Sequence, residues 1–130
     1  MSATLCHDTI YAGASCAVLA RVLDLDDTRL VRADLSTITY TIAELLAGDV
    51  TGEAVDGHED VSLTVADVLF DTLSTGSGWD KDSTGWNFRH VIETDDAVAF
   101  PTEEKRYQVE YTFTTTAGRV IKTRFVLTVK

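Results

Sequence analysis

The fold is decided by the stretch Tyr107-Gln-Val-Glu-Tyr-Thr-Phe-Thr-Thr115 near the end of the chain. Its odd positions from Tyr107 to Phe113 are apolar and its even positions are polar, which is the period-two pattern of a half-buried β-strand. After Thr116-Ala-Gly118, bulky apolar side chains again occupy odd positions up to Val129. Two such stretches predict a closing β-hairpin, with Gly118 at the positive-φ position that a three-residue loop needs.

Three further segments carry strand patterns. Residues 16 to 23 are apolar on both faces, which predicts a strand inside a sheet. In residues 35 to 43, apolar side chains alternate with threonines, which suit the solvent face of a strand. Residues 87 to 92 alternate again, with Phe88, His90 and Ile92 on one side. The sequence therefore predicts a protein built mainly from short strands.

The segments between these strands predict one loop and one helix. Residues 47 to 60 are rich in Gly, Asp and Glu and are expected to form a long mobile loop. Residues 61 to 63 suit a short strand. The start Thr64-Val-Ala-Asp67 resembles a capping box, and apolar residues follow at helical spacing as far as Leu73. One short helix is expected there.

Together these elements predict a single all-β domain over residues 1–130, an immunoglobulin-like antiparallel β-sandwich with one short helix. A small β-barrel is the alternative. Tyr107 stands at the start of the penultimate strand, which is the place of the tyrosine corner in immunoglobulin-like domains.

Composition narrows the class of protein. The 130 residues are 45% hydrophobic and 25% charged, values typical of globular chains and not of disordered ones. No apolar run approaches the roughly 20 residues that cross a bilayer, so we expect no membrane partner. The first residues lack the basic and apolar regions of a signal peptide, which predicts synthesis in a cytoplasm.

Charge is distributed unevenly along the sequence. Residues 1 to 102 contain 5 Lys and Arg against 18 Asp and Glu, whereas residues 103 to 130 contain 6 against 3. The formal net charge of −10 argues against nucleic-acid binding, which depends on clustered Lys and Arg. Lys122 and Arg124 on the even face of the last strand are candidates for contact with an acidic partner. The simpler alternative is a solvated, unevenly charged surface.

The two cysteines suggest no cofactor. Without a secretory signal, Cys6 and Cys16 are expected to be reduced, and Cys16 lies in an apolar run that suits a small core side chain. A disulfide is possible in principle but nothing in the sequence supports it. Cys6, His7 and Cys16 with His58 or His90 lack zinc-ligand spacing.

Asp80-Lys-Asp-Ser-Thr-Gly85 imitates the opening of a calcium loop. The twelfth position from Asp80 is Val91 where an EF-hand needs Glu, and no helices flank the loop, so an EF-hand is excluded. A looser calcium site at Asp80 and Asp82 stays open. The simpler expectation is a polar turn with Gly85 at positive φ, in which nearby acids pair with Arg89 and His90.

Trp79 and Trp86 flank this turn and have two alternative roles. Exposed indoles can stack on a sugar or anchor a partner protein. Inward packing of at least one indole, closing an end of the sandwich, is the alternative that we favour. The two tryptophans are therefore candidate interaction residues, together with Lys122 and Arg124.

No catalytic motif is present, so we expect no enzyme activity and no catalytic residues. The sequence lacks a nucleophile elbow, an H-E-x-x-H motif and both glycine-rich phosphate motifs. Adjacent acids such as Asp26 and Asp27 would point to opposite faces of a strand and would not share a proton.

One resemblance rests on Trp79 and on the segments 68–73, 82–90, 100–101 and 107–113. These residues resemble small uncharacterised proteins of phage and phage-like gene clusters. The end of the chain is also similar to the last strands of phage and bacterial immunoglobulin-like domains. The resemblance implies a structural or assembly module of a virion: a decoration, head-tail joining or tail-associated subunit. Its partners would be other virion proteins in a multimeric particle. A binding module that captures a carbohydrate or surface ligand through Trp79 and Trp86 is the alternative function.

Overall fold

The computed structural model describes residues 4–5, 9–76, 79, 82–93 and 98–130 of the chain, with the side chains of Thr4, Leu5 and Thr9 excepted. In chain order the elements are β1 (Thr4–Leu5), β2 (Thr9–Ile10), β3 (Cys16–Ala20), the 3-10 helix Arg32–Asp34, β4 (Leu35–Leu46), the 3-10 helix Ala47–Asp49, β5 (Val50–Ala54), β6 (Val61–Leu63), α1 (Val65–Val68), β7 (Leu69–Ser74), β8 (Trp86–Ile92), β9 (Arg106–Thr115) and β10 (Val120–Val129).

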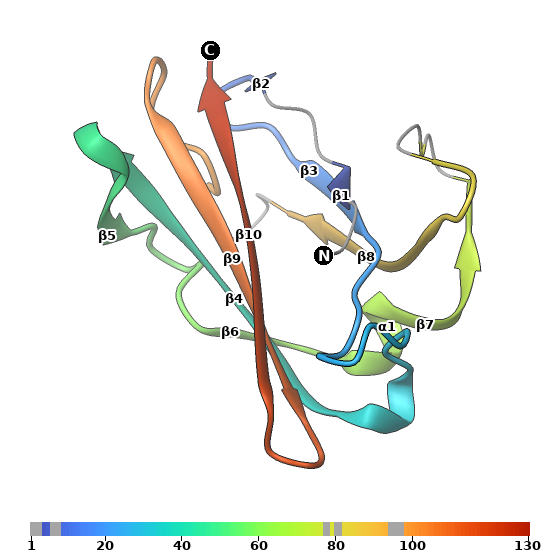
Figure 1. The fold of residues 1–130 in the computed structure, drawn as a ribbon. Helices are drawn as coiled ribbons and strands as arrows, with labels where there is room; N and C mark the ends of the chain where they lie inside the picture. Colours follow the sequence, from blue (N-terminus) through green and yellow to red (C-terminus); the bar gives the residue numbers. More distant parts are fainter. Residues whose placement is uncertain (1–3, 6–8, 77–78, 80–81, 94–97) are drawn as a thin grey trace.

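The strands form two sheets that pack face to face (Figure 1). One sheet has the order β1-β3-β8-β7 and the other has the order β2-β10-β9-β4-β5, with β6 also paired to β4. All pairs are antiparallel except β2 with β10. The chain is therefore an antiparallel β-sandwich.

The strand order is that of an immunoglobulin-like domain. Such domains place strands A, B, E and D on one sheet and C, F and G on the other. Here β1, β3, β8 and β7 take the first order, while β10, β9 and β4 take the second. The predicted fold class, including its one short helix α1, is confirmed.

The tyrosine corner forms as the sequence predicts. The backbone N–H of Thr102, five residues before Tyr107, donates to the Tyr107 hydroxyl at 3.3 Å. In antibody domains the second cysteine of the inter-sheet disulfide follows this Tyr by two residues, a place that Val109 occupies here. Val109 is fully buried, so hydrophobic packing holds the sheets together at this point.

The core lies between the sheets and draws on the alternation seen in the sequence. Tyr107, Val109, Tyr111 and Phe113 of β9 are all buried in one hydrophobic cluster. The hairpin turn places Gly118 at φ 86°, as predicted. Strand β3 lies between β1 and β8, which confirms that its two apolar faces mark an interior strand.

Two predictions between the strands are wrong. Residues 47 to 60 contain β5, which pairs with β4 as a hairpin, because β4 continues to Leu46 and offers it an edge. The helix ends at Val68, and Leu69–Ser74 forms β7 against β8. The Thr64 side chain makes no capping hydrogen bond. Pairing with β8 outweighs a weak helical pattern, because helices this short gain little on their own.

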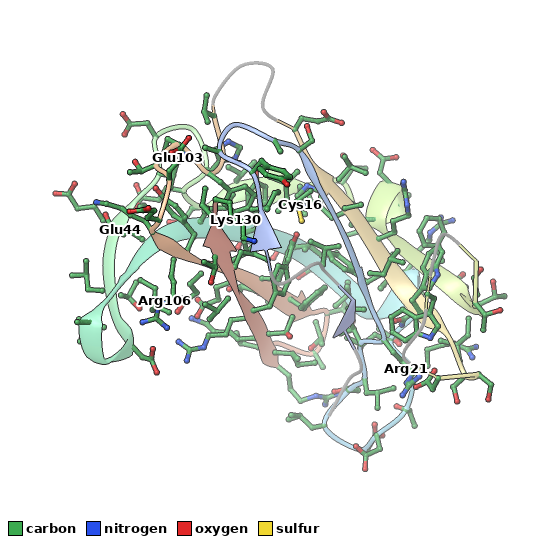
Figure 2. The ribbon with its side chains drawn as sticks, turned by 90° about the horizontal axis from the view of Figure 1, so that it is seen from above. Cys16, Arg21, Glu44, Glu103, Arg106 and Lys130 are labelled. Carbon is green, nitrogen blue, oxygen red and sulfur yellow. The ribbon has the colours of Figure 1, made fainter. Side chains whose placement is uncertain are left out.

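The sandwich has two ends that differ in their side chains. Figure 2 shows Glu44, on β4, and Arg21, just after β3, far apart at opposite ends of the molecule. The end that carries Glu44 is hollowed by a cleft, whereas near Arg21 two tryptophans form a hydrophobic cluster of their own, as described below.

Candidate functional site

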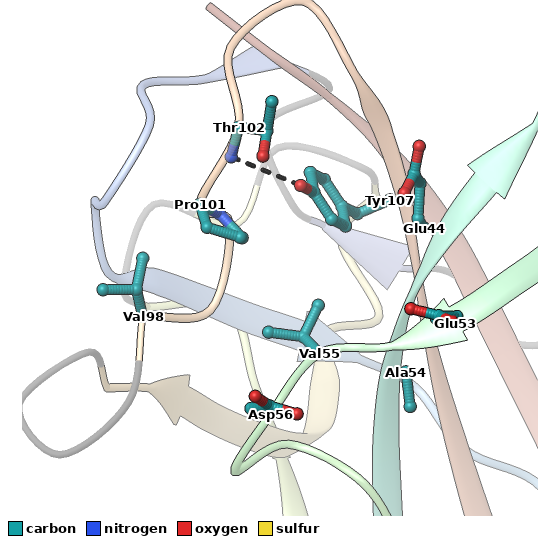
Figure 3. A pocket seen from close by; sticks show the side chains of 9 residues that line it. All are labelled: Glu44, Glu53, Ala54, Val55, Asp56, Val98, Pro101, Thr102 and Tyr107. Carbon is teal, nitrogen blue, oxygen red and sulfur yellow. Dashed lines mark hydrogen bonds between the residues drawn. The ribbon is translucent and has the colours of Figure 1, made fainter.

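A cleft of about 550 Å³ opens at the end of the sandwich where β9 begins (Figure 3). Two stretches that are distant in the sequence meet there: the end of β4 with β5 and the turn after it, and the approach to β9 with the first residues of β9. The lining residues are Glu44, Glu53, Ala54, Val55, Asp56, Val98, Pro101, Thr102 and Tyr107. The volume lies within the range of ligand pockets.

One wall of the cleft is apolar. Val55, Val98, Pro101 and the Tyr107 ring line it, and Val98 is 45% exposed. The Tyr107 hydroxyl is held by the Thr102 backbone N–H, so the ring cannot swing freely into the cleft. This wall therefore offers an ordered apolar surface to a ligand.

The rim of the cleft is acidic. Glu44 lies on β4, Glu53 on β5 and Asp56 in the turn that follows. Glu44 accepts a hydrogen bond from the Lys105 Nζ at 2.8 Å, and this hydrogen bond raises the pKa of Lys105. Glu53 and Asp56 are exposed. The cleft thus combines an apolar wall with carboxylates that attract a cation.

The sequence-based prediction missed this cleft, although β4 carries one signal for it. Glu44 continues the buried row of Ile38, Tyr40 and Ile42 on β4, and it pairs in register with Tyr107. A carboxylate in an inward-facing row is unusual. It marks the point where the space between the sheets opens to solvent.

Trp79 and Trp86 pack inward. Each is 8% exposed, and together with Leu19 they form a second hydrophobic cluster, against which Phe70 packs. The Trp79 Nε1–H donates to Asp82 Oδ1 at 3.1 Å, and the Trp86 Nε1–H donates to the Gly76 carbonyl at 2.9 Å. Both indoles are therefore buried, but in a cluster separate from the main core and not as a plug at the end of the sandwich. Neither presents an open ring face on which a sugar could stack.

Asp82 is the centre of the turn before β8. Its carboxylate accepts hydrogen bonds from the Arg21 guanidinium, the Trp79 indole and the backbone N–H groups of Thr84 and Gly85. The Gly85 N–H and then Arg21 hold the pKa of Asp82 well below its usual range. The expected polar turn forms, with Gly85 at φ 102°. Asp80, the other residue of the open calcium proposal, lies outside the described residues.

The predicted partners of Asp82 are wrong. Arg21, which follows β3, pairs with Asp82, while Arg89 is exposed and His90 bonds the Tyr111 hydroxyl inside the core. The sequence predicts Arg89 and His90 as partners because they follow the loop directly in the chain. The true partner is 61 residues away and comes close only because β3 pairs with β8.

Lys122 and Arg124 lie on the outer face of β10 and are exposed. Lys122 Nζ is 3.6 Å from Glu110 Oε1, and Arg124 donates to Gln108 Oε1 at 2.7 Å. Other cations after residue 102 pair with acids from earlier in the chain: Lys105 with Glu44, Arg106 with Asp49, and Arg119 with Asp24. The charge asymmetry of the sequence is thus matched largely within the folded chain.

Among the described residues, no group of three or more His, Cys, Asp or Glu is arranged to hold a metal ion. Cys16 is buried in the core as expected, and Cys6 and His7 lie outside the described residues. Nor does any helix in the described part of the chain have the length and apolarity needed to span a membrane.

Comparison with known proteins finds a weak similarity in structure to a solved protein. No protein-family model matches the chain, and no curated protein matches it. A solved structure of murine CRIg is similar over 100% of this chain and 98% of its own length, with 15% sequence identity and a TM-score of 0.42. The strand order, and not this likeness, identifies the fold.

Proposed function

We propose that this protein is a non-enzymatic assembly module that binds a partner protein by accepting a basic side chain in the cleft beside Tyr107. The observation that carries the proposal is the pairing of an apolar wall with an acidic rim in one open cleft. In line with the sequence resemblance, we propose that the partner belongs to a phage virion, in which the domain serves as a decoration, head-tail joining or tail-associated subunit.

Lysine and arginine side chains have the matching chemistry. Each has an aliphatic stem that packs on apolar surface and a cationic head that seeks carboxylates. The contact between Lys105 and Glu44 is an intramolecular example of an ammonium group on this rim. Glu53 and Asp56 are exposed and can take a second cation from a partner.

The position of the carboxylates supports a binding role over a catalytic one. A carboxylic acid that donates a proton near neutral pH is usually buried in apolar surroundings that raise its pKa. Glu53 and Asp56 lie exposed at the rim, and Glu44 is paired with Lys105. No Ser, Cys or His lines the cleft among the described residues.

The first test uses a defined probe. A hexa-arginine peptide titrated into labelled protein at low salt should shift the backbone amide signals of Val55, Val98 and Thr102. Asp56→Lys should weaken binding at least tenfold. The matched control is Asp67→Lys, which makes the same charge change on the exposed face of α1. Equal loss in both variants would mean that only net charge matters, and the cleft would not be the site.

The second test addresses the particle. The protein should co-purify with virions produced from the gene cluster that encodes it, and Asp56→Lys should reduce its incorporation while Asp67→Lys should not. A protein that never appears in particles, yet still binds the peptide in its cleft, would remove the virion assignment and leave the binding module.

A further inference from the structure

Two tyrosine–histidine pairs meet inside the core. The Tyr40 Oη is 2.8 Å from His58 Nδ1, and the Tyr111 Oη is 2.7 Å from His90 Nδ1. The rings of Tyr40 and His90 lie 4.9 Å apart between centroids, which joins the two pairs into one cluster. All four side chains are buried, with exposures from 0% to 8%.

The members of this cluster come from both sheets and from the β5–β6 connection. His90 lies on β8 of one sheet, and Tyr40 and Tyr111 lie on β4 and β9 of the other. His58 lies in the connection itself, which was expected to be a mobile loop. Its ring nevertheless reaches the core, because backbone hydrogen bonds tie the connection to β4: Ile42 N–H to the His58 carbonyl and Val55 N–H to the Ile42 carbonyl, each 2.8 Å.

We propose that this Tyr40–His58–His90–Tyr111 cluster is an acid-sensitive latch that fastens residues 55 to 58 to the core at neutral pH and releases them on acidification. Because Val55 and Asp56 line the cleft, release of this segment also opens one wall of the cleft. This proposal concerns the core, and it does not depend on whether a basic side chain binds in the cleft.

The described surroundings of His90 favour its neutral form. Its titratable neighbours are Tyr40 and Tyr111 from β4 and β9 and His58 from the connection, and on β3 the Cys16 thiol lies two residues from Val18, which pairs with His90. Burial raises the pKa of Tyr40, so this phenol stays neutral. Among the described residues, no Asp, Glu, Lys or Arg side chain is buried. A proton taken up by His90 therefore places a positive charge in a poorly solvating environment.

The pH range of release follows from His90. Burial, and then the charge of His58, lower the pKa of His90 from 6.5 to about 4. A histidine with a lowered folded-state pKa binds its proton more readily in the open state. Stability of the closed state is therefore complete above pH 6.5 and falls as the pH decreases from 6.5 to 4. Protonation of His90 alone raises the population of the open state roughly a hundredfold between pH 7 and pH 4.

Movement of the connection is the smallest change that lets water reach the imidazoles. His90 lies in β8, which is paired with β3 and β7 in the same sheet, so its exposure from that side requires these strands to separate. His58 lies between β5 and β6, and hydrogen bonds tie it to β4 and Tyr40. The 55–58 segment should therefore open before the sandwich unfolds.

Amide hydrogen exchange on the full chain tests the latch. After correction for the intrinsic pH dependence, protection of the Ile42 and Val55 amides should fall at least tenfold between pH 7 and pH 4.5, while protection of the β3 and β8 amides falls less. A uniform loss across the protein, or unchanged protection at these two amides, would overturn the proposal.

Two further measurements keep the test independent of any folding defect. NMR titration of the imidazole carbons in the unmodified protein should give His90 a pKa well below 6.5, and a value of 6.5 or higher would contradict the latch. In a folded His90→Phe variant, the pH dependence of the Val55 amide above pH 4 should largely disappear. If it persists unchanged, His90 is not the group that titrates.

Discussion

The turn of the β9–β10 hairpin and the turn that enters β8 each place a glycine at positive φ, but their surroundings differ. Around Gly118, at φ 86°, an added β-carbon would meet nothing within 4 Å. Around Gly85, at φ 102°, the same carbon would clash with the Ser74 carbonyl group, 2.8 Å from its carbon atom. The hairpin turn needs glycine for its backbone angles alone. The turn before β8 needs it also because the backbone of β7 passes directly against it.

The largest difference in the free energy of unfolding is expected between the variants Gly85→Ala and Gly118→Ala. We expect Gly118→Ala to lower the free energy of unfolding by about 1–2 kcal/mol, the usual cost of a left-handed conformation. Gly85→Ala should cost more than about 3 kcal/mol, because the methyl group must also displace Ser74. Urea unfolding followed by tryptophan fluorescence measures both. Similar losses would show that Ser74 moves aside easily.

The two regions also differ in how far the sequence predicts them. The hairpin is local: ten-residue strands with strong alternation define both its register and its inner face. Strand β7 could not be predicted in this way, because Val65, Val68, Leu69 and Leu73 fit a helix as well as a strand, and only pairing with β8 decides between them. Likewise, the positions of Trp79 and Trp86 depend on Leu19 and Phe70, which are not their neighbours in the sequence.

The cleft was harder to predict for the same reason. It joins residue 44, residues 53 to 56, residues 98 to 102 and residue 107, and no local pattern brings these together. The latch is equally hard to predict from the sequence, because His58 lies in a stretch whose composition indicates a loop. Composition describes the exposed residues of that stretch correctly, but not a side chain that turns inward.

Asn87 provides the second prediction. On the outer face of the hairpin, Thr112 is only partly buried, whereas Asn87 at the start of β8 is fully buried. Its amide accepts from the Val22 N–H at 2.7 Å and donates to the carbonyls of Val22 and Leu30. Asn87→Ala removes this partner from the Val22 N–H and the Leu30 carbonyl, while the Val22 carbonyl keeps a hydrogen bond from the Leu30 N–H, and the variant should cost about 2–4 kcal/mol in urea unfolding. Thr112→Ala should change stability by less than about 0.5 kcal/mol. Comparable losses would contradict the importance of the buried hydrogen bonds.

Asp82 provides the third prediction, which concerns acid pH. Because its pKa is lowered in the folded protein, its contribution to stability is present above pH 3.8 and is lost as the pH falls below that value. Asp82→Asn should therefore be destabilised at pH 7 and should lose less stability below pH 4 than the unmodified protein. Urea unfolding at pH 7, 4 and 3 measures this. This acid range lies below that of the His90 latch, so the two effects can be separated.

The matched variant for Asp82 is Glu110→Gln on the hairpin. Glu110 pairs with Lys122 at 3.6 Å on the outer face, whereas Asp82 accepts hydrogen bonds from four donors. We expect Glu110→Gln to leave the acid dependence nearly unchanged. An equal change in both variants would mean that the number of donors does not control the response.

The smallest effect on stability is expected at Lys122 and Arg124. Exposed ion pairs contribute about 0–1 kcal/mol, and Arg124 bonds a neutral amide, so Lys122→Glu and Arg124→Glu should each change the free energy of unfolding by less than about 1 kcal/mol. Because both variants should stay folded, they can show whether the outer face of β10 contacts a partner. If this face docks onto an acidic surface, the double reversal should lower incorporation into particles, and the effect should weaken at high salt. The double reversal could instead leave incorporation unchanged while Asp56→Lys abolishes it. In that case the cations of the hairpin serve mainly to balance the acids of their own chain, and the partner binds at the cleft.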